Sequence, residues 1–542
     1  MNIRRKRDRS SGQNNRQRKG SQRKGTGKGT SKGTGKDTAI GMQPLDRAAS
    51  MMIVLMSVVI AAMLVLGSQA LPSVRTFSWQ DKAVSAEDVA FMFTFTQPVE
   101  QKSVEQNLTI EPELDGKFSW AGRRMAYTLN ASVPYGETYK IELPTAQALS
   151  GQDGFEPFES SFKTRDRVFA YIGAEGEEKG RLVLFNLTRK ERQLLTPESQ
   201  EVMDFKVYPQ RDRILYSAVG DDDIVDGATL PQLYTVSTGL SDGTPSPPRW
   251  KFWSKDQRSE TAESGIVQPV LDNQDFQNLK FDLAPNGEVI VVQRVNREKP
   301  SDYGPWVIMA GEQPRRLETD PGGDFTIAPD SASLLLQQGQ GTAVINLTPD
   351  TDADEPEALL DFLPDYGLTL DIASDGSAAA LVNFNEDDPE KRFTQSLFWV
   401  SNKGDEKQLL QTEGAILSAQ FNENNEILYC LVNKLLPGEG YQVIPYLTAV
   451  NVVTGEEQKL LEMPPQPEIT VSLSPDGLAI LFDEALTSDP KAAALDENFV
   501  GATHRLWLLP LFSTLDERVN NEPVALPPTE LEISGRHPSW LP

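Results

Sequence analysis

The sequence predicts an all-β protein in which a β-sandwich is followed by a seven-bladed β-propeller, with a disordered basic tail and one transmembrane helix ahead of both. The phrase V-S-L-S-P-D-G-L-A-I-L-F at residues 471–482 combines a strand, a tight turn and a second strand, and it recurs at a near-constant period. The stretch V-A-F-M-F-T-F-T at residues 89–96 places three phenylalanines on one face of a strand. An uncharged apolar run at residues 48–67 predicts the helix.

The charge of the chain is divided unequally. Of 52 Lys+Arg and 78 Asp+Glu, residues 1–50 hold 14 basic and 3 acidic residues, a net charge of +11; the remainder therefore holds 38 and 75, a net charge of −37. A strongly acidic domain repels nucleic acid, so no nucleic-acid partner is expected beyond the apolar run. The single cysteine, Cys430, excludes an internal disulfide, and only two histidines are present.

The N-terminal region predicts a membrane tether. Residues 1–47 are mainly Gly, Lys, Arg, Ser and Thr, a composition that predicts disorder, and the basic charge can touch anionic lipid. About 20 apolar residues span a bilayer as a helix, as residues 48–67 would. The basic flank orients the tail into the cytoplasm and the rest of the chain into the periplasm or outside the cell, at the inner (plasma) membrane. The alternative is a signal peptide cleaved after Ala70, although the run and its leader are long for one.

Residues 71–165 predict the sandwich, because several short strands alternate with Pro and Gly turns. The phrases F-T-F-T-Q-P-V (93–99), L-T-I-E-P (108–112) and P-Y-G-E-T-Y-K-I-E-L (134–143) resemble the bacterial Ig-like domain of the S-layer type. This resemblance implies a spacer or adhesion module.

Residues 166–542 predict the propeller. The strand–turn–strand phrase occurs six times, and an additional outer pair begins after residues 168–172 without an inner strand ahead of it. The C-terminal residues 533–542 have the inner-strand pattern and would close this first blade, which gives seven blades and covers free sheet edges. The phrases resemble the TolB-type repeats of bacterial periplasmic propellers, a resemblance that is informative about fold and not about ligand.

The strongest candidate for a binding site is a long insertion between residues 236 and 266. It collects positive charges and large aromatic side chains in an otherwise acidic domain, and these residue types are favoured at protein interfaces and membrane surfaces. An alternative is that the tryptophans fold back onto the propeller or the sandwich. The candidate partner-binding residues are Arg249, Trp250, Lys251, Phe252, Trp253, Lys255 and Arg258.

Other groups give weaker signals. Two acidic clusters, at residues 221–226 and 350–355, lack the spacing of a calcium loop and predict solvated hairpin tips, so no metal or other cofactor is expected. We expect structural roles for the two histidines and the cysteine, because they lie in or beside predicted strands; they are His504, His537 and Cys430. The chain contains no G-x-S-x-G motif, and we expect it not to be an enzyme.

These features predict a membrane-tethered, extracytoplasmic propeller that acts as a protein-binding scaffold in the bacterial cell envelope, because loops on a rigid frame commonly carry binding. One alternative is a module that binds envelope glycan or a small ligand, for which the channel mouth should show exposed aromatics with carboxylates and amides. A propeller hydrolase that uses an acidic pair is the less favoured third reading.

Overall fold

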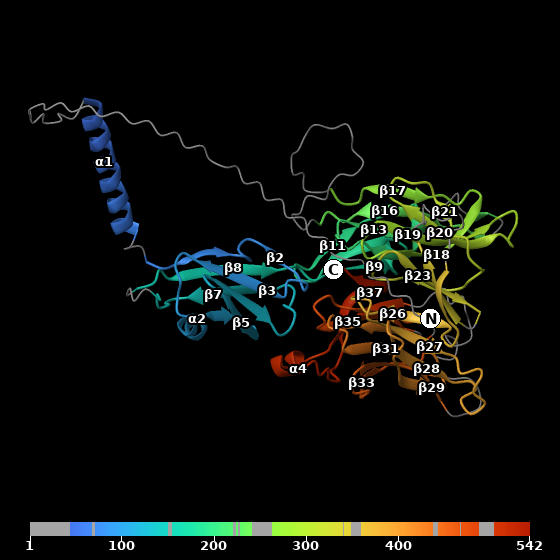
Figure 1. The fold of residues 1–542 in the computed structure, drawn as a ribbon. Helices are drawn as coiled ribbons and strands as arrows, with labels where there is room; N and C mark the ends of the chain where they lie inside the picture. Colours follow the sequence, from blue (N-terminus) through green and yellow to red (C-terminus); the bar gives the residue numbers. More distant parts are fainter. Residues whose placement is uncertain are drawn as a thin grey trace, which may run out of the picture. The chain divides into compact units, whose positions relative to one another are not determined.

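The computed structural model describes residues 44–67, 71–149, 154–220, 224–225, 228–240, 263–339, 341–347, 359–436, 443–466, 468–486 and 503–542. The chain divides into two compact units, Met1–Ala70 and Leu71–Pro542 (Figure 1).

The first unit contains helix α1 (Pro44–Gly67). The helix begins at Pro44, within the stretch predicted as tail, because proline is well tolerated at the first helical position. Its side chains are described over residues 47–63, and from Met51 to Met63 they are exposed. No helix among the described residues is long and apolar enough to cross a membrane. The transmembrane assignment of residues 48–67 is therefore not confirmed.

The second unit starts with two four-stranded sheets, ordered β1-β3-β6-β5 and β2-β8-β7-β4, with the short helix α2 (Gln101–Asn107) between β3 and β4. All pairings in them are antiparallel except that of β2 with β8. The strands are β1 (Val74–Phe77), β2 (Ala83–Val84), β3 (Ala90–Phe95), β4 (Thr109–Glu111), β5 (Gly116–Ala121), β6 (Arg124–Leu129), β7 (Thr138–Leu143) and β8 (Phe158–Thr164).

An aromatic core lies between these sheets. Phe91, Phe93 and Phe95 of β3 are fully buried, whereas Met92 between them is 49% exposed. The Phe93 ring meets those of Phe77 and Phe158 edge to face, with centroids 5.2 and 5.1 Å apart. The alternation along β3 therefore separates core from solvent, and we call these two sheets the sandwich.

Replacement of Phe93 by alanine should destabilise the sandwich by about 4 kcal/mol, since it removes a large buried ring and leaves a cavity. Met92→Ala on the opposite face of the same strand is the matched control and should change stability little. Urea unfolding of the full chain measures both. Equal shifts for the two variants would contradict the assigned faces.

The strands from β9 onward, as far as they are described, form five four-stranded sheets, one seven-stranded sheet and a hairpin of β14 and β15. The four-stranded sheets follow chain order and are antiparallel. Their strands are β12 (Gln200–Val207), β13 (Arg213–Gly220), β16 (Gln232–Ser237), β17 (Val267–Leu271); β18 (Phe276–Leu283), β19 (Val289–Asn296), β20 (Tyr303–Met309), β21 (Arg315–Arg316); β22 (Phe325–Ile327), β23 (Ser333–Gln338), β24 (Gly341–Asn346), β25 (Leu359–Leu363); β26 (Leu368–Ile372), β27 (Ala378–Asn383), β28 (Gln395–Ser401), β29 (Glu406–Thr412); and β30 (Ile416–Phe421), β31 (Ile427–Leu435), β32 (Val443–Asn451), β33 (Glu457–Glu462). The hairpin strands are β14 (Ile224–Val225) and β15 (Ala228–Thr229).

The recurring sequence phrase forms the same turn each time. In the turn between β34 and β35, Gly477 N–H donates to Ser474 O at 2.8 Å, and Ser474 N–H donates to Ala479 O at 2.8 Å. One position of this turn has a positive φ, which glycine adopts without strain and other residues adopt at a cost. The residues at this position are Arg211, Gly287, Ser331, Gly376, Asn425 and Gly477.

Both ends of residues 168–542 meet in the seven-stranded sheet, ordered β11-β10-β9-β37-β36-β35-β34. The first half of β37 (Thr529–Trp540) pairs with β36, and its second half pairs with β9, where Trp540 lies opposite Phe169. The two halves meet at Gly535, where an added Cβ would lie 2.5 Å from the Tyr171 ring. The strand begins at Thr529 rather than at residue 533 because its first half is an outer strand of the last blade. The other strands are β9 (Val168–Gly173), β10 (Leu182–Asn186), β11 (Glu191–Leu194), β34 (Val471–Leu473), β35 (Ala479–Leu486) and β36 (Thr503–Pro510).

The prediction of an all-β protein with a propeller is confirmed, and the blade number of seven stays a prediction.

Candidate functional site

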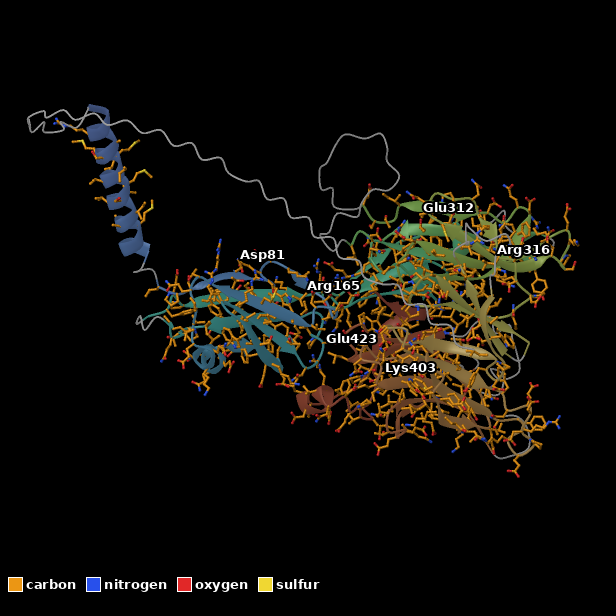
Figure 2. All side chains as sticks on the ribbon, viewed as in Figure 1. Asp81, Arg165, Glu312, Arg316, Lys403 and Glu423 are labelled. Atoms are coloured by element: carbon orange, nitrogen blue, oxygen red, sulfur yellow. The ribbon has the colours of Figure 1, made fainter. Side chains whose placement is uncertain are left out.

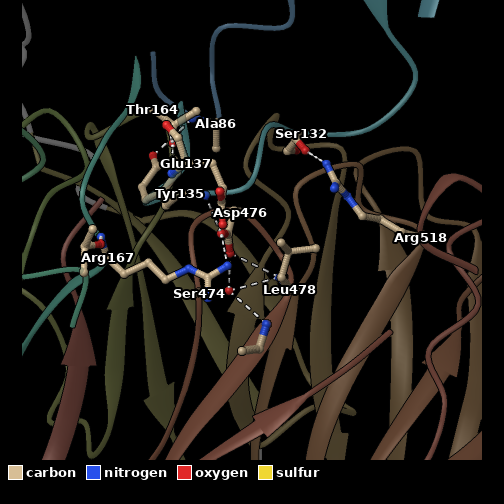
Figure 3. A network of polar contacts seen from close by, with 12 residues as sticks. Ala86, Ser132, Tyr135, Glu137, Thr164, Arg167, Ser474, Asp476, Leu478 and Arg518 are labelled. Carbon is tan, nitrogen blue, oxygen red and sulfur yellow. Dashed lines mark hydrogen bonds and ion pairs between the residues drawn. The ribbon is translucent and has the colours of Figure 1, made fainter. Parts of the chain in front are cut away.

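The turn between β34 and β35 holds a buried carboxylate where the propeller meets the sandwich (Figure 3). Asp476 is 5% exposed. Its Oδ1 accepts from Ser474 Oγ at 2.6 Å, and its Oδ2 accepts from the backbone N–H of Tyr135 at 3.0 Å. The Arg167 guanidinium lies 3.9 Å from the same Oδ2. One carboxylate therefore joins its own turn, the sandwich and the segment that links them.

On the sandwich side, the loop between β6 and β7 forms the contact. The Tyr135 hydroxyl accepts from Ala86 N–H at 3.1 Å, and burial raises the pKa of Tyr135. The next residue, Gly136, has φ +80° and donates to the carbonyl of Arg165 at 2.7 Å. These bonds fix the direction of the Tyr135 N–H toward Asp476.

A second contact comes from helix α4 (Leu515–Val519). A capping box of Thr514 and Glu517 begins this short helix, and burial lowers the pKa of Arg518 within it. Arg518 Nη2 donates to Ser132 O, and Ser132 Oγ donates to Glu423 Oε2. Burial raises the pKa of Glu423, which belongs to the turn between β30 and β31. In Figure 2 Arg165 and Glu423 are labelled along this boundary.

A cleft of about 290 Å³ lies between the contacts of the junction. Its polar lining can form hydrogen bonds with a small polar molecule, and its aromatic side chains add apolar surface. The alternative of a glycan-binding module predicted aromatic, carboxylate and amide side chains together at the channel mouth, whereas here they line a cleft at the junction. The lining includes Asn130, Asn422, Asn424, Asn521, Glu423 and Phe512.

The inner strands of successive sheets are joined by a repeated polar contact. At four of the six turns, the side chain five residues before the positive-φ position accepts a hydrogen bond from a backbone N–H of a neighbouring inner strand. Because the contacts join equivalent positions, these strands run in the same direction. The contacts are Asp282 to Ile327 (2.9 Å), Asp371 to Phe421 (2.7 Å), Gln420 to Leu473 (2.8 Å) and Ser472 to Trp540 (3.2 Å).

Titratable groups in the same strands have altered pKa values. Burial raises the pKa of Asp371 to about 6 and lowers that of Lys280 to about 8. His537 Nε2 lies 3.2 Å from Asp204 Oδ1, and burial lowers the pKa of His537. The backbone N–H of His537 donates to Asp483 Oδ2 at 2.9 Å, so this histidine takes part in contacts between strands.

The remaining sequence candidates are distributed as follows. His504 lies within β36, and burial lowers its pKa. Cys430 is fully buried in β31, and burial raises the pKa of its thiol. In the described part of the chain, no three His, Cys, Asp or Glu side chains are placed to hold a metal ion.

The candidate partner-binding residues of the insertion lie outside the described residues; they are Arg249, Trp250, Lys251, Phe252, Trp253, Lys255 and Arg258. Both acidic clusters also lie outside the described residues, apart from Ile224 and Val225 within the first cluster.

Sequence reasoning missed the junction. Asp476 belongs to the recurring turn phrase, which predicts the turn and not a contact with a residue 341 positions away, so its second role has no local signal. Arg518 follows a T-x-x-E capping pattern, which predicts the short helix and not its contact with Ser132.

The matches to known proteins come from solved structures. No family model and no curated protein matches the chain. Among solved structures, TolB from Acinetobacter baumannii is 10% identical, with a TM-score of 0.37, and the match covers 80% of this chain and 83% of that one. The periplasmic gluconolactonase of Pseudomonas aeruginosa is 12% identical, with a TM-score of 0.39, and the match covers 70% of this chain and 99% of that one. An oligogalacturonate lyase from Vibrio parahaemolyticus is 10% identical, with a TM-score of 0.37, and the match covers 59% of this chain and 88% of that one. Similar structures thus include TolB-type β-propeller proteins.

The prediction that the chain is not an enzyme is wrong, because the similar structures include a gluconolactonase and a lyase, which are enzymes. It rested on the missing G-x-S-x-G motif, and that motif identifies only hydrolases with a serine nucleophile. At 10 to 12% identity and with TM-scores of 0.37 and 0.39, the likeness assigns no activity to this chain.

Proposed function

We propose that this chain is a bacterial envelope β-propeller that acts as a protein-binding scaffold, tethered at the inner membrane by its N-terminal region and carrying an Ig-like sandwich as a spacer. The observation that carries the proposal is the junction: Asp476 and Arg518 both bond to the sandwich backbone, at Tyr135 and Ser132.

A spacer that only separates two parts needs no such contacts. Relative motion is the default between domains of one chain unless their interface is extensive. A buried carboxylate that accepts a hydrogen bond across the junction resists motion, since separation would leave its partners unsatisfied or rehydrated. The junction therefore gives the propeller a set orientation on its spacer, which is what a scaffold requires.

The N-terminal region supports the tether. The apolar side chains of α1 between Met51 and Met63 are exposed, and lipid is a partner of matching chemistry. Fourteen basic residues within the first 50 are suited to the cytoplasmic side of such a tether, and the net charge of −37 beyond them to the other side.

In-cell crosslinking of the full chain, followed by detergent extraction and mass spectrometry, tests the scaffold. A defined protein partner in stoichiometric amount is the expected result. A variant lacking residues 244–258 tests whether the predicted insertion residues make the contact. A chain that remains intact at the membrane and crosslinks to no protein would contradict the proposal.

A further inference from the structure

The connection between β27 and β28, residues 384–394, presents an aromatic side chain to solvent. Phe393 is 85% exposed and has φ +73°. A bulky residue in this backbone region is a genuine outlier, and the conformation costs free energy that burial of the ring does not offset.

Buried polar contacts hold the connection in this conformation. Asn385 is 7% exposed and itself has φ +54°. Its Nδ2 donates to Thr394 Oγ1 and to Ser396 Oγ, both at 2.9 Å. Thr394 Oγ1 in turn donates to Lys391 O at 2.7 Å. The position of Phe393 is thus set by the residues on both sides of it.

The connection lies on the end of the propeller away from the sandwich. Strands alternate in direction within each sheet, so the turns after first and third strands lie at one end, and connections after second strands lie at the other. Asp476, Glu423 and Arg518 belong to the first group and contact the sandwich. Residues 384–394 follow a second strand, β27, and belong to the other end.

The charges around Phe393 indicate the chemistry of an occupant. The Arg392 guanidinium lies 5.4 Å from the centre of the Phe393 ring, and Lys391 lies 3.8 Å from Asp388. Asp387 and Glu390 are exposed beside them. Residues 384–394 carry four acidic and two basic side chains, so the connection has a net charge of −2, which complements a pocket with a basic rim.

We propose that Phe393 is the anchor by which this propeller docks a protein partner whose apolar pocket is rimmed by lysine or arginine. The inference rests on the proposed scaffold function and names the contact within it. Aromatic residues are common binding hot spots, and here the pocket would cover a ring that solvent now surrounds.

The test compares Phe393→Gly with Val453→Ser in the full chain. Glycine accepts the positive φ without strain, so Phe393→Gly should leave the melting temperature unchanged or raised. Loss of a hot spot should weaken partner binding about 30-fold. Val453 is 73% exposed in the turn after the third strand β32, at the other end, and its variant should bind as the unaltered chain does.

A benzoylphenylalanine photo-crosslinker at position 393 identifies the contact. The supporting result is a crosslinked peptide from an apolar pocket with a basic rim, together with weakened binding of the purified partner to Phe393→Gly. A partner retained by Phe393→Gly, including one lost on deletion of residues 244–258, would overturn this inference and leave the scaffold proposal standing. Absence of any partner for the unaltered chain would overturn both.

Discussion

Deletion of residues 535–542 should abolish cooperative folding of the propeller. Residues 535–540 form the half of β37 that pairs with β9, and Leu541 and Pro542 follow it. Their removal strips the pairing from one edge of β9 and takes away Trp540 and Leu541, which are 7% and 1% exposed. Loss of two large buried side chains and of the backbone bonds across this edge should cost about 5 kcal/mol or more, comparable with the whole stability of a domain.

Circular dichroism and urea unfolding of the truncated chain measure the effect. A synthetic peptide of residues 530–542, added in trans, is the matched control and should restore part of the folded signal. An unfolding midpoint and slope equal to those of the full chain would contradict the role assigned to the closing strand.

Substitution of Asp476 by alanine should loosen the junction and destabilise the second unit by about 3 kcal/mol, because the Tyr135 N–H and the Ser474 hydroxyl lose their acceptor in a buried site. Arg167 would also lose its neighbouring carboxylate. Urea unfolding gives the stability change, and limited proteolysis around Arg165 reports the loosening.

Asp375 provides a control at the same position of an equivalent turn, between β26 and β27. Its Oδ1 accepts from Ser377 N–H at 2.9 Å, the Ser377 side chain bonds to the same carboxylate, and among the described residues these contacts stay within the turn. Asp375→Ala should therefore shift the unfolding midpoint far less than Asp476→Ala. Equal shifts would assign the effect to the turn and not to the junction.

Local patterns predict most of the fold. Alternation at residues 89–96 indicates which phenylalanines of β3 are buried, and the recurring turn phrase indicates the hairpins that begin the blades. Both signals act within a few residues, through strand faces and through the backbone preferences of turn residues. The C-terminal pattern also indicated an inner strand, but not that its first half serves the neighbouring blade.

The junction and the Phe393 connection depend on contacts that no local pattern carries. Tyr135 and Asp476 are 341 positions apart, so their hydrogen bond exists only once both domains are folded. The positive φ of Phe393 depends on a buried amide, Asn385, and no residue preference would predict it for phenylalanine. The sequence favoured the aromatic insertion as the binding site because amino-acid composition can be read from a sequence, whereas the exposure of a single side chain cannot.

Pulsed electron–electron double resonance between labels on the sandwich and the propeller tests the rigid junction most directly. Cysteines introduced at Lys117 and Lys403, both exposed, would take the labels, since Cys430 is fully buried and no other cysteine is present. The account predicts one narrow distance distribution that broadens in Asp476→Ala. A broad or multiple distribution in the unaltered chain would contradict a scaffold whose sandwich and propeller are held in one orientation.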